Sequence, residues 1–250
     1  MRDVRLKSAD DVERIREAGR IIAGIFAEIS GDGLADQSTL EIDRFIEERI
    51  HRHKARPSFK TIRRYDHASC ISLNNEIVHG VPSKNKIVRA GDLVKIDIGV
   101  VKNGYFADSC VTFLVEPVAE RAAFLARTTE EALARAIPLL CAGNRLGDVG
   151  AAIQSLAESR GFSVVRDFTG HGVGFAVHEQ PTVPHFGRKG TGRIIEEGMV
   201  LAVEPMLNEG APDVLSLRDG WTVVTADGRL SAQYEHTVAV TANGPVVLTV

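Results

Sequence analysis

The chain has 250 residues, of which 44% are hydrophobic and 25% are charged, and its formal net charge is −3. These values are typical of a globular protein with one large domain or two closely joined halves. The charge gives no overall basis for binding nucleic acid, and no apolar run approaches the roughly 18 residues of a membrane span, so we expect no membrane association.

The cysteines and the N-terminal residues bear on cellular location. Cys70, Cys110 and Cys141 are an odd and sparse set without zinc-finger spacing, so they indicate reduced thiols rather than a disulfide framework. The first residues are charged and lack the apolar region of a secretory signal. We therefore expect a cytoplasmic protein.

The first half of the chain reads as helices followed by strands. Residues 9–29 and 38–54 carry apolar residues at helical spacing, and the second segment opens with a capping serine or threonine followed by acids. Strands are expected from about 58 to 79. Residues 91–115 then predict two long strands joined by an Asn103-Gly104 turn, which is a strong hairpin signal.

The second half repeats this order, with helices expected at 119–137 and 144–161 before further strands. Residues 87–97 and 194–204 match in identity or class at seven of eleven positions, and their final acids, Asp97 and Glu204, coincide. A second match, of 107–113 with 234–240, sets Asp108 against Glu235. The alternative is chance similarity between amphipathic strands. We interpret residues 1–250 as a single α+β domain with pseudo-repeat halves at about 8–115 and 118–250.

The hairpin turn fixes which residues face one another. With Asn103-Gly104 as the turn, Gly99 lies opposite Asp108 and Asp97 lies opposite Cys110. The two acids are then diagonal neighbours on one face, about 7 Å apart or less, and Gly99 leaves open space beside Asp108. The other face is apolar and is expected to pack against helices.

Four carboxylates should therefore converge if Glu204 and Glu235 are presented in the same way by the second half. Uncompensated, they would repel one another and raise each other's pKa. Two divalent cations about 3.5–4 Å apart, bridged by some of the carboxylates, would resolve that repulsion. For any single acid the alternative is a buried structural residue held by hydrogen bonds.

Three histidines lie in glycine- or proline-flanked loops and are the next candidates. His171 sits between two glycines, His178 follows seven residues later, and His79 is the corresponding residue of the first half. Each histidine taken alone could be a surface residue or a residue whose hydrogen bonds are satisfied within the protein. One histidine with four carboxylates is an oxygen-rich set that favours Co²⁺, Mn²⁺ or Fe²⁺, with Zn²⁺ or Ni²⁺ left open.

Taken in order, these motifs resemble the type I methionine aminopeptidases, whose fold is often called pita-bread. The motifs are the strand pair with Asp97 and Asp108, GHGVGFAVHEQP, LAVEPML around Glu204 and SAQYEHT around Glu235. The resemblance covers essentially the whole chain and implies pseudo-symmetric α+β halves around a dinuclear metal site. The implied metal ligands are Asp97, Asp108, His171, Glu204 and Glu235.

The same resemblance implies further roles around the site. His79 and His178 would contact the substrate peptide and the tetrahedral intermediate, and Glu204 would also transfer a proton. The residues expected around the methionine side chain are Phe59, Tyr65, Cys70 and Trp221. Val177 and Phe175 depart from the family pattern, and both would touch the pocket or its rim.

The implied function is metal-dependent removal of the initiator methionine from nascent chains and peptides, with a small second residue, by a monomer. The alternatives are an Xaa-Pro-type aminopeptidase of the same fold and a non-catalytic peptide-binding relative. Residues 51–64 hold six Lys or Arg and no acid, which suggests transient ribosome association. The competing interpretation is a helix C-terminus, where basic residues are favoured.

Overall fold

The computed structural model describes residues 4–250. Its helices are α1 (Ala9–Ala27), α2 (Gly31–Leu34), α3 (Thr39–Arg52), α4 (Glu120–Ala136) and α5 (Leu146–Ser159), with short 3-10 turns at Phe59–Thr61 and Ile137–Leu139. Its strands are β1 (Arg56–Pro57), β2 (Ser69–Leu73), β3 (Glu76–Val78), β4 (Leu93–Lys102), β5 (Tyr105–Leu114), β6 (Ser163–Val164), β7 (Gly170–Gly172), β8 (Glu179–Val183), β9 (Val200–Val203), β10 (Met206–Asn208), β11 (Val214–Ser216), β12 (Val223–Thr225), β13 (Ser231–Gln233), β14 (His236–Thr241) and β15 (Gly244–Val247).

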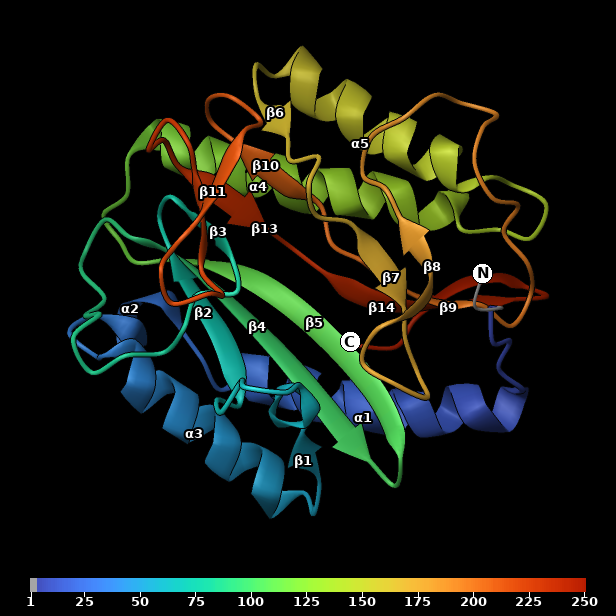
Figure 1. Cartoon of the computed structure of the whole chain (residues 1–250), viewed down its shortest axis with the longest axis horizontal. Helices are drawn as coiled ribbons and strands as arrows, with labels where there is room; N and C mark the ends of the chain where they lie inside the picture. Colours follow the sequence, from blue (N-terminus) through green and yellow to red (C-terminus); the bar gives the residue numbers. More distant parts are fainter. Residues whose placement is uncertain (1–3) are drawn as a thin grey trace.

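The strands lie between two groups of helices (Figure 1). Helices α1 and α3, in blue, lie on one side of the central strands, and α4 and α5, in green and yellow, lie on the other. The four long helices predicted from apolar spacing are confirmed to within about two residues at most ends. The α+β fold class is confirmed by this arrangement.

Serine caps begin the two helices of the first half. Ser8 precedes α1 and Ser38 precedes α3, and each forms a capping box with the acid three residues later, Asp11 or Glu41. Each box satisfies two of the backbone N–H groups that a helix start leaves without partners. The predicted start at residue 38 is therefore confirmed together with its physical cause.

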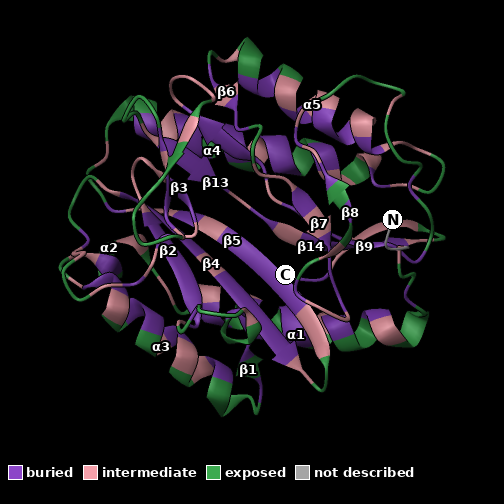
Figure 2. Cartoon of the chain, viewed as in Figure 1, coloured by how far each residue is buried: buried purple, intermediate pink, exposed green. Residues whose placement is uncertain are grey.

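The core lies along the central strands, which are mostly buried (Figure 2). One cluster packs the apolar face of the β4–β5 hairpin against α1 and α3, through residues such as Ile15, Ile46 and Ile96. A second cluster packs α4 and α5 against β9 and β14. Among residues 4–250, no helix is long and apolar enough to cross a membrane.

The hairpin register agrees with the prediction from the turn. β4 pairs with β5 so that Asp97 lies opposite Cys110 and Gly99 lies opposite Asp108. The turn residue Asn103 has a φ of 51° and Gly104 a φ of 85°, the left-handed pair that a type I′ turn requires. Asp97 and Asp108 are therefore diagonal neighbours on one face of the hairpin.

The expectation of strands from 58 to 79 is only partly right. Strands β2 and β3 occupy its second part, but Phe59–Thr61 is a 3-10 turn and a loop follows to Ala68. Phe59, Ile62 and Tyr65 recur every third residue, the period of a 3-10 turn rather than of a strand. Phe59 and Tyr65 are buried in the same apolar cluster, and this packing decides the conformation.

The acids of the second half are placed differently from those of the first. β9 pairs with β14 so that Val203 lies opposite His236, and β10 pairs with β13 so that Met206 lies opposite Gln233. The same register sets Glu204 directly opposite Glu235, in the short gap between the two ladders. The expectation of an identical diagonal presentation is therefore wrong, and the division into pseudo-repeat halves stays a prediction.

Candidate active site

The two halves meet where β5 runs beside the start of β14. Cys110 N–H donates to the Glu235 carbonyl at 3.4 Å, and Glu235 N–H donates to the Cys110 carbonyl at 2.8 Å. Two residues earlier than Cys110 and two residues later than Glu235, Asp108 N–H donates to Oγ1 of Thr237 at 3.1 Å. This ladder brings the hairpin acid Asp108 to the acid Glu235 of the second half.

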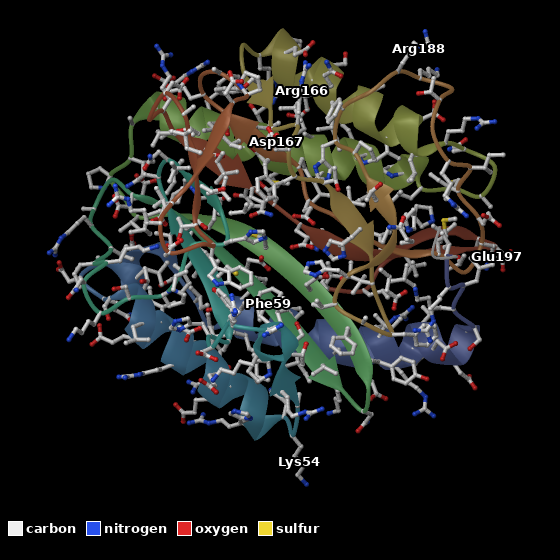
Figure 3. The ribbon with its side chains drawn as sticks, in the orientation of Figure 1. Lys54, Phe59, Arg166, Asp167, Arg188 and Glu197 are labelled. Atoms are coloured by element: carbon white, nitrogen blue, oxygen red, sulfur yellow. The ribbon has the colours of Figure 1, made fainter. Side chains whose placement is uncertain are left out.

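A pocket of about 360 Å³ opens over this junction. Figure 3 labels two of its lining residues, Phe59 from the first half of the chain and Asp167 from the second. All eleven site residues predicted from the sequence line this one pocket: Phe59, Tyr65, Cys70, His79, Asp97, Asp108, His171, His178, Glu204, Trp221 and Glu235. Their individual roles stay predictions.

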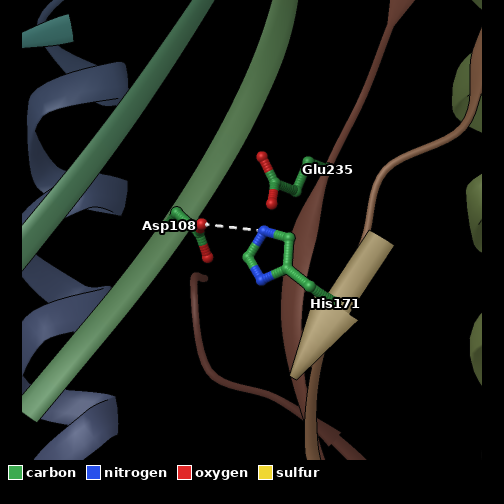
Figure 4. A group of neighbouring side chains, drawn as sticks. All are labelled: Asp108, His171 and Glu235. Carbon is green, nitrogen blue, oxygen red and sulfur yellow. Dashed lines mark ion pairs between the residues drawn. The ribbon is translucent and has the colours of Figure 1, made fainter. Parts of the chain in front are cut away.

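The polar part of the pocket is a tight cluster of one histidine and several carboxylates. Nε2 of His171 lies 3.5 Å from Oδ2 of Asp108 and 3.4 Å from Oε1 of Glu204. One ligand atom from each of Asp108, His171 and Glu235 lies within 4.8 Å of the others. Figure 4 shows these three side chains pointing toward one another from β5, β7 and the residue before β14.

Burial raises the pKa of the carboxylates. The pKa of Asp97 and of Glu235 is well above its ordinary value because burial disfavours the charge and neighbouring acids add repulsion. Burial does the same to Glu204, with Asp97 and Asp108 adding to it, and it raises the pKa of Asp108 to about 6. Perturbed acids gathered in a pocket are typical of functional sites.

The donor set fits a divalent metal ion on two observations. Nδ1 of His171 lies 2.9 Å from the Gly172 carbonyl, which can only accept, so in the neutral ring Nδ1 carries the proton and Nε2 presents a lone pair to the carboxylates. Burial lowers the pKa of His171 to about 4, which favours that neutral ring. Oδ1 of Asp97 is buried and has no hydrogen-bond partner among residues 4–250. A cation would satisfy both groups.

Two more histidines flank the cluster. His79 follows β3 with a φ of 58°, an uncommon conformation outside glycine that is often found at functional sites. Burial lowers the pKa of His79 to about 4, and its ring lies edge-on to Phe168 with centroids 5.6 Å apart. His178 is exposed, and its ring lies edge-on to that of His171 with centroids 4.4 Å apart.

Aromatic side chains line the apolar part of the pocket. The Tyr65 ring lies edge-on to Trp221, with centroids 5.0 Å apart, and the Trp221 indole N–H donates to the Arg64 carbonyl at 3.2 Å. The expectation of open space at Gly99 is wrong, because Phe59 fills it. A Cβ atom on Gly99 would lie 2.6 Å from Cε1 of Phe59 and 2.0 Å from Oγ of Ser58.

The two departures noted in the sequence lie in different environments. Val177 is buried and packs with Phe59, Tyr65 and Cys70, so it lies behind the apolar wall but does not itself line the pocket. Phe175 does not line the pocket, so its expected place at the rim is wrong. The centroid of its ring instead lies 4.1 Å from the Arg5 guanidinium carbon, an attractive cation–π contact.

Known proteins of one family are similar to this chain over nearly its whole length. The model of metallopeptidase family M24 matches residues 13–242. The chain belongs to this family. A methionine aminopeptidase from Clostridium perfringens is 46% identical over 244 residues, which cover 98% of each chain. The crystal structure of a methionine aminopeptidase from Thermotoga maritima aligns with a TM-score of 0.96 at 40% identity and covers 99% of each chain.

A more distant M24 fold is also similar. A prolidase from Pyrococcus furiosus aligns with a TM-score of 0.76 at 23% identity, covering 98% of this chain and 65% of that one. At this identity the likeness concerns the fold alone. The higher identity and complete coverage place this chain with the methionine aminopeptidases of family M24, and it is therefore a metallopeptidase.

Sequence reasoning missed several residues of this M24 pocket. Asp167, Phe168 and Thr169 line it and come directly before the Gly-His-Gly motif, so their position in the chain could have identified them. His185 and Gln233 support Glu204 from outside the lining, since His185 Nε2 accepts from its backbone N–H at 3.2 Å and Gln233 donates to Oε2 at 3.1 Å. No sequence pattern signalled those two contacts. The remaining lining residues that were not predicted are Ile62, Val78, Gly170 and Thr182.

Proposed function

We propose that this chain removes N-terminal methionine from nascent proteins and peptides, using divalent metal ions bound by Asp97, Asp108, His171, Glu204 and Glu235. The observation that carries the proposal is a single pocket in which an apolar, aromatic part adjoins the carboxylate–histidine cluster. The activity of the similar proteins, methionine aminopeptidases from Clostridium perfringens and Thermotoga maritima, supports the same proposal.

Two ions per chain, of Co²⁺, Mn²⁺ or Fe²⁺, suit the donor set better than one, because four carboxylates with a single imidazole can bridge a pair of hard cations. Zn²⁺ and Ni²⁺ are the less favoured alternatives. Such ions supply Lewis acidity, which activates a water molecule near neutral pH and polarises a carbonyl. All five proposed ligands lie in one chain, so the site requires no residue from a second subunit, and the proposed active form is a monomer.

Glu204 is the proposed proton carrier. Gln233 holds its Oε2 atom, while Oε1 faces His171 and the pocket. A carboxylate placed beside the attacking water can accept its proton and return it to the leaving amine. Glu204 would thus act both as a ligand and in proton transfer.

His79 and His178 are the proposed hydrogen-bond donors to the substrate. Burial lowers the pKa of His79 to about 4, which favours a neutral ring, and both rings lie at the pocket, where an imidazole N–H can donate to the scissile carbonyl or the developing oxyanion. The apolar part, with Phe59, Tyr65 and Trp221, would take the unbranched methionine side chain. Cys70 adds a buried sulfur to the same wall.

The alternative functions are separated by substrate. Cleavage of Met-Ala-Ser should exceed cleavage of an Ala-Pro peptide by the same metal-loaded sample. The opposite preference would indicate an Xaa-Pro aminopeptidase of the same fold. Absence of metal-dependent turnover on both peptides would indicate a non-catalytic peptide-binding relative. Methionine removal from nascent chains also implies the cytoplasm as the place of action.

Ribosome association is a second part of the proposal. Among the residues expected to form a basic patch, Arg52 pairs with Glu48 at 2.6 Å and Lys60 pairs with Glu47. These pairs reduce the charge available to a partner. Four exposed basic residues, Lys54, Arg56, Arg63 and Arg64, have no ion pair among residues 4–250. Exposed basic groups beside the pocket wall would attract the phosphates of ribosomal RNA near the nascent chain.

The test changes those four residues together to Glu. Salt-sensitive cosedimentation with ribosomes should weaken, whereas cleavage of free Met-Ala-Ser should change much less. Wild-type protein that does not cosediment even at low salt would contradict the association. A variant that binds ribosomes as well as the wild type would contradict this choice of surface.

A further inference from the structure

A buried ion pair joins the N-terminal segment to the loop that carries His178. Nζ of Lys7 lies 2.6 Å from Oε2 of Glu179, and the two side chains are 1% and 7% exposed. The partners are 172 residues apart in the chain. Removing an ion pair from water costs free energy, and the attraction between the two charges offsets this cost only when their geometry is well fixed. The pair therefore fixes one part of the chain against another.

Glu179 uses its other oxygen to hold the loop itself. Oε1 accepts hydrogen bonds from the backbone N–H groups of Phe175 at 2.6 Å and Ala176 at 2.8 Å. A Cβ atom on Gly174, whose φ is 136°, would lie 2.7 Å from Cδ1 of Ile15 and 2.8 Å from Cε of Lys7. Glu179 thus closes the loop through hydrogen bonds, and at Gly174 the loop packs against Lys7 and α1 too closely to admit a Cβ atom.

Lys7 is itself held firmly. Its backbone N–H donates to the Gly198 carbonyl at 2.7 Å, and the capping box of Ser8 and Asp11 begins α1 at the next residues. Arg5 lies over the Phe175 ring on the same side of the loop. The ammonium group therefore reaches Glu179 from a fixed backbone rather than from a free terminus.

We propose that Lys7 is a positioning residue for His178. By neutralising Glu179 it holds the loop between residues 174 and 179, and with it the imidazole of His178 at the edge of the His171 ring. The inference rests on the proposed function, in which His178 donates a hydrogen bond to the reacting peptide. A misplacement of about 1 Å at such a group can cost on the order of a hundredfold in rate.

The first test compares Lys7→Met with Lys84→Met, an exposed lysine as the matched control. In metal-loaded protein, Lys7→Met should lower kcat for Met-Ala-Ser roughly ten- to a hundredfold, with metal content unchanged. Lys84→Met should behave like the wild type. A Lys7→Met variant with the kcat of the wild type would overturn the proposal.

The double variant Lys7→Met/Glu179→Gln separates the effect of the two charges on kcat from the effect of the hydrogen bonds within the loop. The glutamine oxygen can still accept from Phe175 and Ala176, and neither charge is left unpaired. We expect kcat to recover to about three- to tenfold below that of the wild type. Without such recovery, the loss in Lys7→Met cannot be attributed to an unpaired Glu179, and the proposal fails.

The deciding comparison repeats Lys7→Met in a His178→Ala background. If Lys7 acts through His178, its replacement should change kcat less than about threefold once the imidazole is gone, because the two effects are not additive. Equal losses in both backgrounds would show a merely structural role and overturn the positioning proposal alone. An unchanged kcat in His178→Ala by itself would instead contradict the role of His178 in the proposed function.

A spectroscopic measurement supplies a readout independent of turnover. The imidazole carbon–proton NMR signal of His178, assigned by its absence in His178→Ala, should shift in Lys7→Met, while the signal of the exposed His53 should not. If Lys7→Met fails to fold, the double variant takes its place in both the coupling comparison and the spectrum. A double variant with the kcat and His178 signal of the wild type would then overturn the proposal.

Discussion

The Phe59 ring and the Ser58 hydroxyl lie where a side chain on Gly99 would otherwise be, so a glycine of β4 leaves room for an aromatic residue, forty positions earlier, that lines the pocket. Asp97 and Asp108 lie beside this contact, since Gly99 pairs with Asp108 in the hairpin. The carboxylate–histidine cluster and the apolar wall therefore meet at β4, and a change at Gly99 is expected to affect both.

Gly99→Ala should displace Phe59 and destabilise the protein. The added methyl group would overlap the Ser58 hydroxyl and the Phe59 ring, and overpacking of this kind costs about 1–3 kcal/mol. We expect a lower midpoint of thermal unfolding and a higher KM for Met-Ala-Ser. Gly24→Ala is the control, since nothing lies within 4 Å of its added Cβ on α1. An unchanged KM in Gly99→Ala would show that Phe59 does not shape the methionine pocket.

His79→Ala should leave the metal content intact but lower kcat. A neutral imidazole at the pocket wall supplies one hydrogen bond in the transition state, and the loss of such a donor typically costs on the order of 10²-fold. Metal analysis alongside turnover checks both parts, with His53→Ala as an exposed-histidine control. If metal is lost from His79→Ala, then His79 is a ligand or supports one.

A small second residue should be required in the substrate. The peptide beyond the methionine must leave past His79 and His178, and bulk there would displace the scissile carbonyl by an ångström or so, at a cost of about 10²-fold. The kcat/KM for Met-Ala-Ser and for Met-Lys-Ser checks this. Equal values for the two peptides would rule out a crowded rim.

The metal-free protein should lose stability as pH rises. The pKa of folded Asp108 is about 6 against an ordinary 3.8, so its contribution is fully present below pH 3.8 and is lost as pH rises through 6. Asp97, Glu204 and Glu235, whose pKa values lie well above ordinary, extend this loss to higher pH. Thermal unfolding with chelator and with Mn²⁺ should therefore diverge from pH 5 to pH 8. A constant difference would contradict carboxylates that need a cation.

The sequence predicted the features that depend on local patterns. The Asn103-Gly104 turn fixed the register of the hairpin, and that register placed Asp97 and Asp108 on one face. Helical spacing located the long helices, and the Gly-His-Gly motif located His171. These features need only neighbouring residues, a turn type or the alternation of a strand.

The features it did not predict depend on packing between distant segments. Phe59 fills the space at Gly99, and Lys7 reaches Glu179 across 172 residues, but neither contact leaves a periodic signal. His185 supports the backbone of Glu204 through a single hydrogen bond. The direct opposition of Glu204 and Glu235 follows from a register that an inserted loop of the second half obscured.

Two ligand replacements test the cluster residue by residue. Asp97→Ala and Asp108→Ala should each remove bound metal and nearly all turnover, because each removes a ligand from a shared set. Metal analysis and Met-Ala-Ser cleavage are measured on the same samples. Near-normal activity with metal retained in either variant would falsify the assignment of two bound ions.

The most direct test of the central claim is Met-Ala-Ser cleavage by the wild-type protein after chelation and readdition of single metals. The account predicts that turnover disappears with the metal and returns with Co²⁺, Mn²⁺ or Fe²⁺. Unchanged cleavage by protein shown to be free of metal would contradict it.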